Sequence, residues 1–243
     1  MLLTLEEVHL SRWRGPRPLP VLRDVTLELA AGESVGIYGQ RGAGKSTLLR
    51  VAAGFCGVDS GRVLVDGADL SQMSRRARAR LLRTTLAWVD HTAPQSGELP
   101  ARAFVALPLY RETGPRQAQH RALTALERVG ASDCADERWA NLSDTERTLV
   151  AIAQGLVREP KLLLVDDPTA RLDLIDRERV GGLLRAAAHD GGCGVLMTGA
   201  ELAAMRHADR VLTLSRGRLL AAAERESGRG GAVVEFPRDV RSA

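Results

Sequence analysis

Apolar residues near the N-terminus alternate with polar ones or form short runs, as is typical of strands, and turn residues separate these runs. Alternating or continuous apolar runs predict strands at Leu3 to Leu10, Val25 to Leu29 and Ser34 to Tyr38. A helix is expected after the glycine-rich stretch that follows, and a further strand and turn at 63–67. The short, turn-separated runs indicate that the chain starts with antiparallel strands.

The pattern changes in the middle of the chain. A basic helix near 75–83 and a strand at 84–89 are followed by a segment, about 91–157, in which apolar residues recur at helical spacing. Within it, Arg116 to Val129 and Thr145 to Val157 are the clearest helices. Strand signals then return at three places, separated by helical stretches at 174–188 and 200–206. These strands are Lys161 to Asp166, Gly194 to Thr198 and Arg210 to Leu214.

Strands alternating with helices are typical of a parallel sheet covered on both faces. We therefore predict an α/β fold: a core with a mixed sheet, antiparallel at its N-terminal strands and doubly wound and parallel elsewhere. An α-helical subdomain is inserted into it. The expected boundaries are 1–90 and 158–222 for the core, 91–157 for the helical subdomain and 223–243 for a flexible tail. In that tail, Val233 to Phe236 has the composition of an edge strand.

Composition argues against several other classes of protein. The three cysteines are widely spaced, which disfavours a metal or redox site, and no run of about 18 apolar residues predicts a membrane span. The net charge of +4 is modest, and the basic residues are scattered, so nucleic-acid binding is disfavoured. The dense cluster at 75–80 suits a solvated helix face, although it could also contact phosphate or acidic lipid. We expect a soluble cytoplasmic protein.

A glycine-rich loop provides the first chemical signal. Residues 39–47 fit GxxxxGK[ST] between a predicted strand and a predicted helix, and comprise Gly39, Gln40, Arg41, Gly42, Ala43, Gly44, Lys45, Ser46 and Thr47. Such a loop turns backbone N–H groups toward phosphates, while Lys45 adds a charge and Ser46 can bind Mg²⁺. The sequence therefore predicts a site for a nucleotide and Mg²⁺.

An apolar strand ending in two carboxylates provides the second signal. Leu162 to Val165 is followed by Asp166 and Asp167, at the sheet edge where phosphate sites form. Asp166 is the expected partner of Mg²⁺. A strand ending in Asp-Asp-Pro is an ordinary turn signal when it occurs alone, and the phosphate loop favours the functional interpretation.

These motifs predict that the α/β core is a P-loop NTPase core, and they make residues 3–222 resemble the ATPase subunits of ABC transporters. Walker A at 39–47, a Leu142-Ser143 segment and Walker B at 161–167 follow the order of that family, and the Val150 to Ala153 core of its signature helix is intact. By the same resemblance, Ala170 to Asp173 matches the D-loop, and Trp13 stands where the family stacks adenine. Trp13 could instead cap the sheet. Residues 105–109 resemble the branch that serves lipoprotein release and macrolide efflux.

Three functional positions depart from the family pattern near the phosphates. The catalytic Glu is replaced by Asp167, whose carboxylate falls about 1.5 Å short. The H-loop histidine is replaced by Gly199, which has no side chain. The Q-loop glutamine is replaced by His91, which could bind a water or be a solvated loop residue. The resemblance therefore implies weakened hydrolysis.

The signature segment departs as well. Its two glycines are replaced by Asp144 and Thr145, which stiffen the backbone and add a carboxylate where the family contacts a partner's γ-phosphate. Ser143 and Glu146 instead form an S-x-x-E capping box, so we expect this segment to serve mainly as a stable helix start.

The resemblance implies head-to-tail dimers on separate membrane-spanning permease subunits, at the inner face of the cell membrane. Two copies of this chain would carry the same defects in both sites. We therefore favour an ATP-binding, hydrolysis-impaired scaffold beside a second, competent ABC ATPase subunit, although pairing with itself remains an alternative. A slow but genuine ATPase is the second hypothesis, and a soluble nucleotide-dependent interaction protein is the third.

Overall fold

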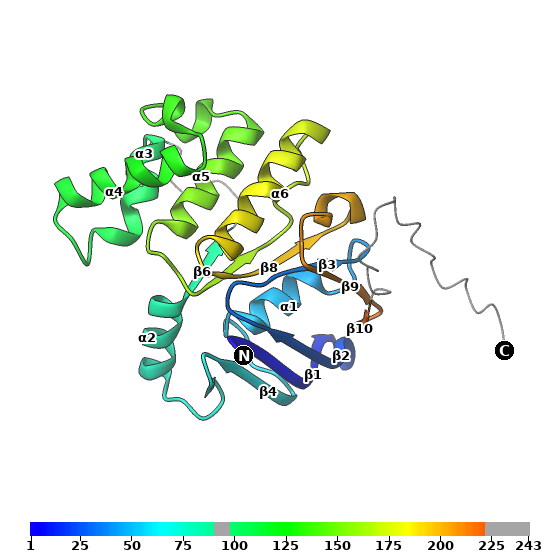
Figure 1. Ribbon diagram of the computed structural model, residues 1–243. Coiled ribbons are helices and arrows are strands. Elements are labelled where there is room, and N and C mark those ends of the chain that lie inside the picture. The colour runs from blue at the N-terminus through cyan, green and yellow to red at the C-terminus, as the bar shows by residue number, and fades with distance from the viewer. Residues whose placement is uncertain (90–97, 222–243) are drawn as a thin grey trace.

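The computed structural model describes residues 1–89 and 98–221, which form two sheets surrounded by helices (Figure 1). The strands are β1 (Leu3–Arg14), β2 (Arg17–Leu29), β3 (Ser34–Tyr38), β4 (Ser60–Val65), β5 (Ala68–Asp69), β6 (Leu86–Val89), β7 (Leu162–Val165), β8 (Gly194–Gly199), β9 (Arg210–Ser215) and β10 (Arg218–Ala221). The helices are α1 (Lys45–Ala52), α2 (Arg75–Thr85), α3 (Ala101–Ala106), α4 (Pro115–Arg128), α5 (Asp144–Leu156) and α6 (Leu174–His189). Short 3₁₀ turns are η1 (Leu107–Leu109), η2 (Ser132–Cys134), η3 (Trp139–Asn141) and η4 (Leu202–Met205).

The two sheets differ in the direction of their strands. The smaller sheet is antiparallel, in the order β2-β1-β4-β5. The larger sheet has the order β10-β9-β3-β8-β7-β6, and all its strands are parallel except β10 at one edge. The helices α3, α4 and α5 form a helical subdomain. Together with the two sheets, they confirm the α/β prediction of an antiparallel N-terminal sheet, a parallel core and a helical subdomain.

The larger sheet separates two hydrophobic cores, and β7 shows how. Leu162 and Leu164 face a core shared with α1 and the smaller sheet, whereas Leu163 and Val165 face one shared with α3 to α6. All four side chains are buried because successive residues of a strand point to opposite faces. Figure 1 shows α1 on one side of this sheet and α5 and α6 on the other. A continuous apolar run is thus required at β7.

Some sequence predictions were wrong in detail. The first two strands are longer than the predicted Leu3 to Leu10 and Val25 to Leu29: β1 continues to Arg14, β2 begins at Arg17, and only Gly15 and Pro16 form the turn between them. Pro18 and Pro20 fit because β2 lies at a sheet edge, where a missing N–H costs little. The strand β10 was not predicted, and the helix at 200–206 is only the short turn η4. The possible strand at 233–236 lies outside the described residues.

No helix within 1–89 and 98–221 is long and apolar enough to cross a bilayer.

One carboxylate fixes the start of β3 to the start of β9. Oδ2 of Asp209 accepts hydrogen bonds from the N–H of Ser34 at 2.8 Å and from its hydroxyl at 2.7 Å. Oδ1 of Asp209 lies 2.9 Å from Nε2 of His189. Burial by itself raises the pKa of Asp209, but the hydrogen bonds from Ser34 and His189 outweigh it and lower the pKa.

We expect Asp209→Asn to lower the free energy of unfolding by about 2 kcal/mol at neutral pH. The folded pKa is lowered, so the stabilisation is complete above the unfolded value of about 3.9 and is lost as the pH falls through the folded value. Urea unfolding of both proteins between neutral and acidic pH measures this. A stability difference that stays constant across that range would contradict the role of ionised Asp209.

Candidate functional site

The candidate site forms at the C-terminal ends of three neighbouring parallel strands in the larger sheet. β8 lies between β3 and β7, so the residues that follow these strands meet there. The phosphate loop follows β3, and Asp166 and Asp167 follow β7. Thr198 and Gly199 end β8 between them. The sheet therefore brings together three segments far apart in the sequence.

The phosphate loop has the backbone conformation that its glycines allow. Gly42 and Gly44 have φ values of 84° and 106°, in the left-handed region that glycine adopts without strain. Gly44 is also the N-cap residue of α1, so the loop leads directly into a helix N-terminus. The ammonium group of Lys45 donates to the carbonyl of Gly39 at 2.6 Å and to that of Gln40 at 3.1 Å. These features provide N–H groups, a helix dipole and a cation at one place.

The hairpin of β1 and β2 packs against this loop. Nη2 of Arg12 donates to the hydroxyl of Thr47 at 3.1 Å, and a Cβ on Gly44 would lie 3.0 Å from the carbonyl of Val21. The neighbouring Trp13 is 74% exposed. An exposed indole is available to stack on a purine, and that role for Trp13 stays a prediction.

Thr198 connects the two carboxylates that follow β7. Its hydroxyl donates to Oδ1 of Asp166 at 2.7 Å and accepts from the N–H of Asp167 at 3.1 Å. Thr198 is buried, and Asp167 has a left-handed φ of 49°. The buried hydroxyl therefore orients the Asp166 carboxylate and supports an uncommon backbone conformation at Asp167.

The Asp166 carboxylate and the Ser46 hydroxyl are the oxygen donors that Mg²⁺ prefers. Ser46 is exposed in the first turn of α1, and Asp166 is half-buried, with one of its oxygens held by Thr198. The two residues therefore fit the chemistry of this ion. Bound there, Mg²⁺ would neutralise phosphate charge.

Gly199 lies against the end of the Asp167 side chain. A Cβ on Gly199 would be 3.7 Å from Oδ1 of Asp167 and 2.7 Å from Cε of Met205. The buried Met205 therefore fills the space beside this position. A Cβ at position 199 would therefore lie in van der Waals contact with the Asp167 carboxylate, and the flexible end of Met205 would have to move to make room for it.

The predicted capping box at the start of α5 is confirmed. Ser143 is the N-cap residue, and its hydroxyl accepts from the N–H of Glu146 at 3.2 Å. In return, Oε2 of Glu146 accepts from the N–H of Ser143 at 2.8 Å and from its hydroxyl at 2.8 Å. These bonds lower the pKa of Glu146. The N-terminus of α5 is therefore occupied by a carboxylate of the chain itself.

The other two signature residues also make contacts within the chain. The hydroxyl of Thr145 donates to the carboxylate of Asp176 in the first turn of α6. Oδ1 of Asp144 lies 3.4 Å from the Arg147 guanidinium. The start of α5 is thus tied to the start of α6.

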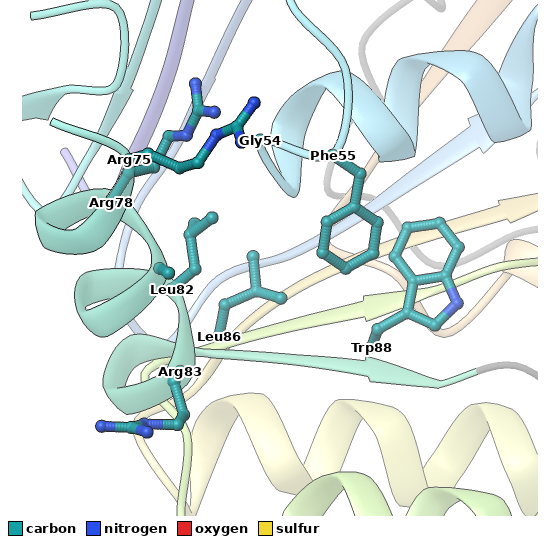
Figure 2. Close-up of a pocket in the computed structure, with 9 residues that line it drawn as sticks. Gly54, Phe55, Arg75, Arg78, Leu82, Arg83, Leu86 and Trp88 are labelled. Carbon is teal, nitrogen blue, oxygen red and sulfur yellow. The ribbon is translucent and has the colours of Figure 1, made fainter. Parts of the chain in front are cut away.

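A groove with a volume of about 450 Å³ lies on another part of the surface, between the end of α1, the helix α2 and the strand β6. Figure 2 shows the rings of Phe55 and Trp88 side by side, with Leu82 and Leu86 near them and Arg75 and Arg78 across the groove. The ring centroids are 5.4 Å apart, and Phe55 is 60% exposed. The groove combines an apolar floor with arginines.

The sequence predictions fare differently at this site. The fold gathers the phosphate loop, Asp166, Asp167 and Gly199 at one sheet edge, whereas His91 lies outside the described residues. Sequence reasoning missed the contacts of Thr198 and Asp176. A threonine ending an apolar strand beside the Walker B strand was a signal for the first, but nothing in the sequence pointed to the second.

The fold and the site define a P-loop nucleotide-binding protein. The profile of the ABC transporter family matches residues 22–170. A lipoprotein-releasing system ATP-binding protein, LolD, from Shewanella sp. (strain MR-4) is 35% identical over 92% of this chain and 97% of its own length. LolD 2 from Caulobacter vibrioides is 36% identical over 83% of this chain and 89% of its own length.

A similar solved structure is a dimer of the ATP-binding cassette MJ0796 in a post-hydrolysis state with ADP and Pi. It has a TM-score of 0.82 and 25% sequence identity, and the match covers 89% of this chain and 96% of that one. The chain belongs to the ABC transporter family, and its fold is that of the family's ATP-binding subunits.

We expect Thr198→Val to weaken nucleotide binding that depends on Mg²⁺, because Asp166 loses the donor that orients it. The affinity for ATP should fall about tenfold with Mg²⁺ present, given the usual value of a hydrogen bond to a charged group. It should change little in excess chelator. Titration calorimetry under both conditions measures this, and Thr198→Ser, which keeps the hydroxyl, is the control. Equal losses in both conditions would argue for general misfolding instead.

Proposed function

We propose that this chain is an ATP-binding, hydrolysis-impaired subunit of an ABC transporter. It acts as a regulatory or scaffold half beside a competent ATPase subunit, on membrane-spanning permease subunits at the inner face of the cell membrane. The names of the LolD relatives favour a transporter of the lipoprotein-releasing type.

The corner formed by Asp167 and Gly199 is the observation that carries this proposal. Hydrolysis needs a base or positioning group for the attacking water, and displacement by about 1 Å can cost about 10²-fold in rate. Here a shorter carboxylate lies next to a residue without a side chain, and Met205 fills the adjoining space. Little remains to orient a water molecule at this corner.

The parts that bind phosphate are present. Lys45, the glycines of the loop and the N-terminus of α1 meet at one place, and Asp166 is oriented by Thr198. Binding alone can shift a conformational equilibrium if ATP has a higher affinity for one state. ATP binding to this chain can therefore change the conformation of its complex with partner subunits without ATP hydrolysis.

A slow but genuine ATPase is the alternative. In that case Asp167 would act as the base, and groups from a partner subunit would replace the missing side chain at position 199. The carboxylate at position 167, close to the Cβ site of Gly199, is what favours this alternative.

Purified chain at saturating Mg²⁺-ATP should bind ATP while releasing phosphate no faster than Lys45→Ala, which lacks the cation of the loop. Binding and phosphate release are measured on the same sample. Release clearly above the Lys45→Ala background would identify the chain as an ATPase with a rearranged site.

Restoring the family's Glu and His at positions 167 and 199 tests whether their loss is the cause of the impaired hydrolysis that we propose. We expect Asp167→Glu combined with Gly199→His to raise phosphate release by about ten- to a hundredfold. The matched control is Asp167→Glu with Gly199→Gln, which also displaces Met205 but supplies no imidazole. If the His variant binds ATP and still shows no gain, the missing-residue explanation is wrong.

The groove of Figure 2 is our proposed docking site for a membrane-spanning subunit. Its exposed Phe55 and the arginines of α2 suit an apolar segment with carboxylates. We expect Phe55→Asp to abolish copurification with the permease that is expressed with the chain, while ATP binding is unchanged. The control is Arg76→Ala, an exposed residue of α2 that is not among those lining the groove. Unchanged copurification of Phe55→Asp would exclude this groove.

A further inference from the structure

The helix α2 carries a dense group of arginines. Five of its 11 residues are arginine, whereas residues 70–89 contain no Asp or Glu. The five are Arg75, Arg76, Arg78, Arg80 and Arg83. Because the whole chain has a net charge of only +4, the charges outside α2 nearly balance one another. The positive charge of this protein is therefore concentrated on one helix.

The rest of the fold does not neutralise these arginines. Across residues 1–89 and 98–221, none of the five lies within ion-pair distance of a carboxylate. Arginines of the two sheets behave differently: Arg62 pairs with Glu6, and Arg210 pairs with Glu33. The charge of α2 is thus left to the solvent or to an external anion.

The arginines do not stabilise the helix itself either. Arg75 and Arg76 occupy the first turn of α2, where the helix dipole favours acidic residues, and no acidic residue is present there. Arg76 and Arg80 are four residues apart, so their like charges repel each other. Only Arg83, in the last turn, suits the dipole. Residues that break local rules in this way are expected at functional surfaces.

Three of the arginines form one exposed face. Arg76, Arg80 and Arg83 follow the spacing i, i+4 and i+7, which places them on the same side of a helix, and all three are exposed. They span about 10 Å along the helix axis. Figure 2 shows Arg83 pointing away from Phe55 and Trp88, the aromatic side chains of the groove. We call Arg76, Arg80 and Arg83 the α2 arginine face.

The apolar residues of α2 attach the helix to the domain. Leu81 and Leu82 are half-buried and pack against the core shared by α1 and the smaller sheet. They are not free to enter a bilayer while the domain is folded, so the α2 arginine face can act only through its charge. Each guanidinium can bind a phosphate through two N–H groups. A row of them along an exposed helix is complementary to an array of phosphates.

We infer that the α2 arginine face binds the anionic phospholipid headgroups of a membrane surface. The inference goes beyond the proposed function, because this contact needs neither nucleotide nor a permease. A membrane presents many phosphates in one plane, so all three arginines can engage it at once. Each basic side chain near an anionic membrane surface strengthens binding about fivefold. Arg75 and Arg78, on the same helix, add to the attraction.

Membrane binding by α2 brings the neighbouring groove to the bilayer. α2 forms one wall of the groove that we propose as the docking site for a membrane-spanning subunit. A chain held at the membrane surface therefore meets such a subunit at a higher effective concentration than a chain free in solution. The two contacts are distinct, because Phe55 belongs to the groove and not to the α2 arginine face.

Cosedimentation of the full chain with lipid vesicles, in the absence of a permease, tests the inference. We expect the chain to bind vesicles that contain phosphatidylglycerol at least about tenfold more tightly than vesicles of pure phosphatidylcholine. Added salt should weaken the binding, because exposed charges are screened. Inorganic phosphate at matched ionic strength should not displace the chain. Equal binding to both kinds of vesicle, or displacement by phosphate, would overturn the inference.

Removing three charges tests which residues carry the contact. Arg76→Gln, Arg80→Gln and Arg83→Gln combined should weaken binding to anionic vesicles about a hundredfold, at about fivefold for each charge. The matched control removes three exposed arginines of α4 and α6 that form no ion pair with a described residue, and it should lose far less. These are Arg116, Arg128 and Arg185. Equal losses in the two variants would assign the binding to the net charge of the chain and contradict the inference.

Two further measurements separate charge from misfolding and from a protein partner. The Gln variant should unfold in urea at the same or a higher concentration, because Gln is a good helix former and the repulsion between Arg76 and Arg80 is removed. Arg→Lys at the same three positions keeps the charge and should keep most of the vesicle binding. A Lys variant that binds as weakly as the Gln variant would contradict a charge-based contact. A Gln variant that binds vesicles normally but no longer copurifies with the permease would assign the arginines to a protein partner and refute the inference.

Discussion

The burial of β8 between β3 and β7 is the constraint on which the site depends. Every residue of β8 is buried, so its register with both neighbours is fixed by packing on both faces of the sheet. That register places Thr198 beside Asp166 and Gly199 beside the start of the phosphate loop, where the N–H of Gly39 donates to the carbonyl of Gly199 at 3.3 Å. The phosphate loop and the carboxylates could not share one site without it.

The site separates nucleotide binding from hydrolysis physically. Binding relies on backbone N–H groups, on the dipole of α1 and on Lys45, all within one continuous segment after β3. Hydrolysis requires side chains from two other strands to be placed within about an ångström. At that corner Asp167 is short, Gly199 has no side chain, and Met205 takes the adjoining space. Under the function we propose, impaired hydrolysis therefore need not weaken nucleotide binding.

The polar groups of the signature segment are satisfied within the chain. Its helix N-terminus, where an incoming anion would be favoured, holds the carboxylate of Glu146 in the capping box. Thr145 is hydrogen-bonded to Asp176 of the same chain. A segment that satisfies its own hydrogen bonds gains little from a phosphate.

The sequence by itself determined the fold class, the phosphate loop and the start of α5. These depend on local signals: apolar periodicity, glycines that permit φ values such as 106° at Gly44, and the S-x-x-E pattern at Ser143. It did not determine β10, whose short run carries no distinctive pattern, or the length of the hairpin, because only the sheet order shows that β2 is an edge strand that tolerates proline. Only the tertiary structure revealed that Thr198 orients Asp166 and that Thr145 meets Asp176, since each pair is separated by about thirty residues. Such contacts depend on how strands and helices pack together, and local sequence patterns do not determine that packing.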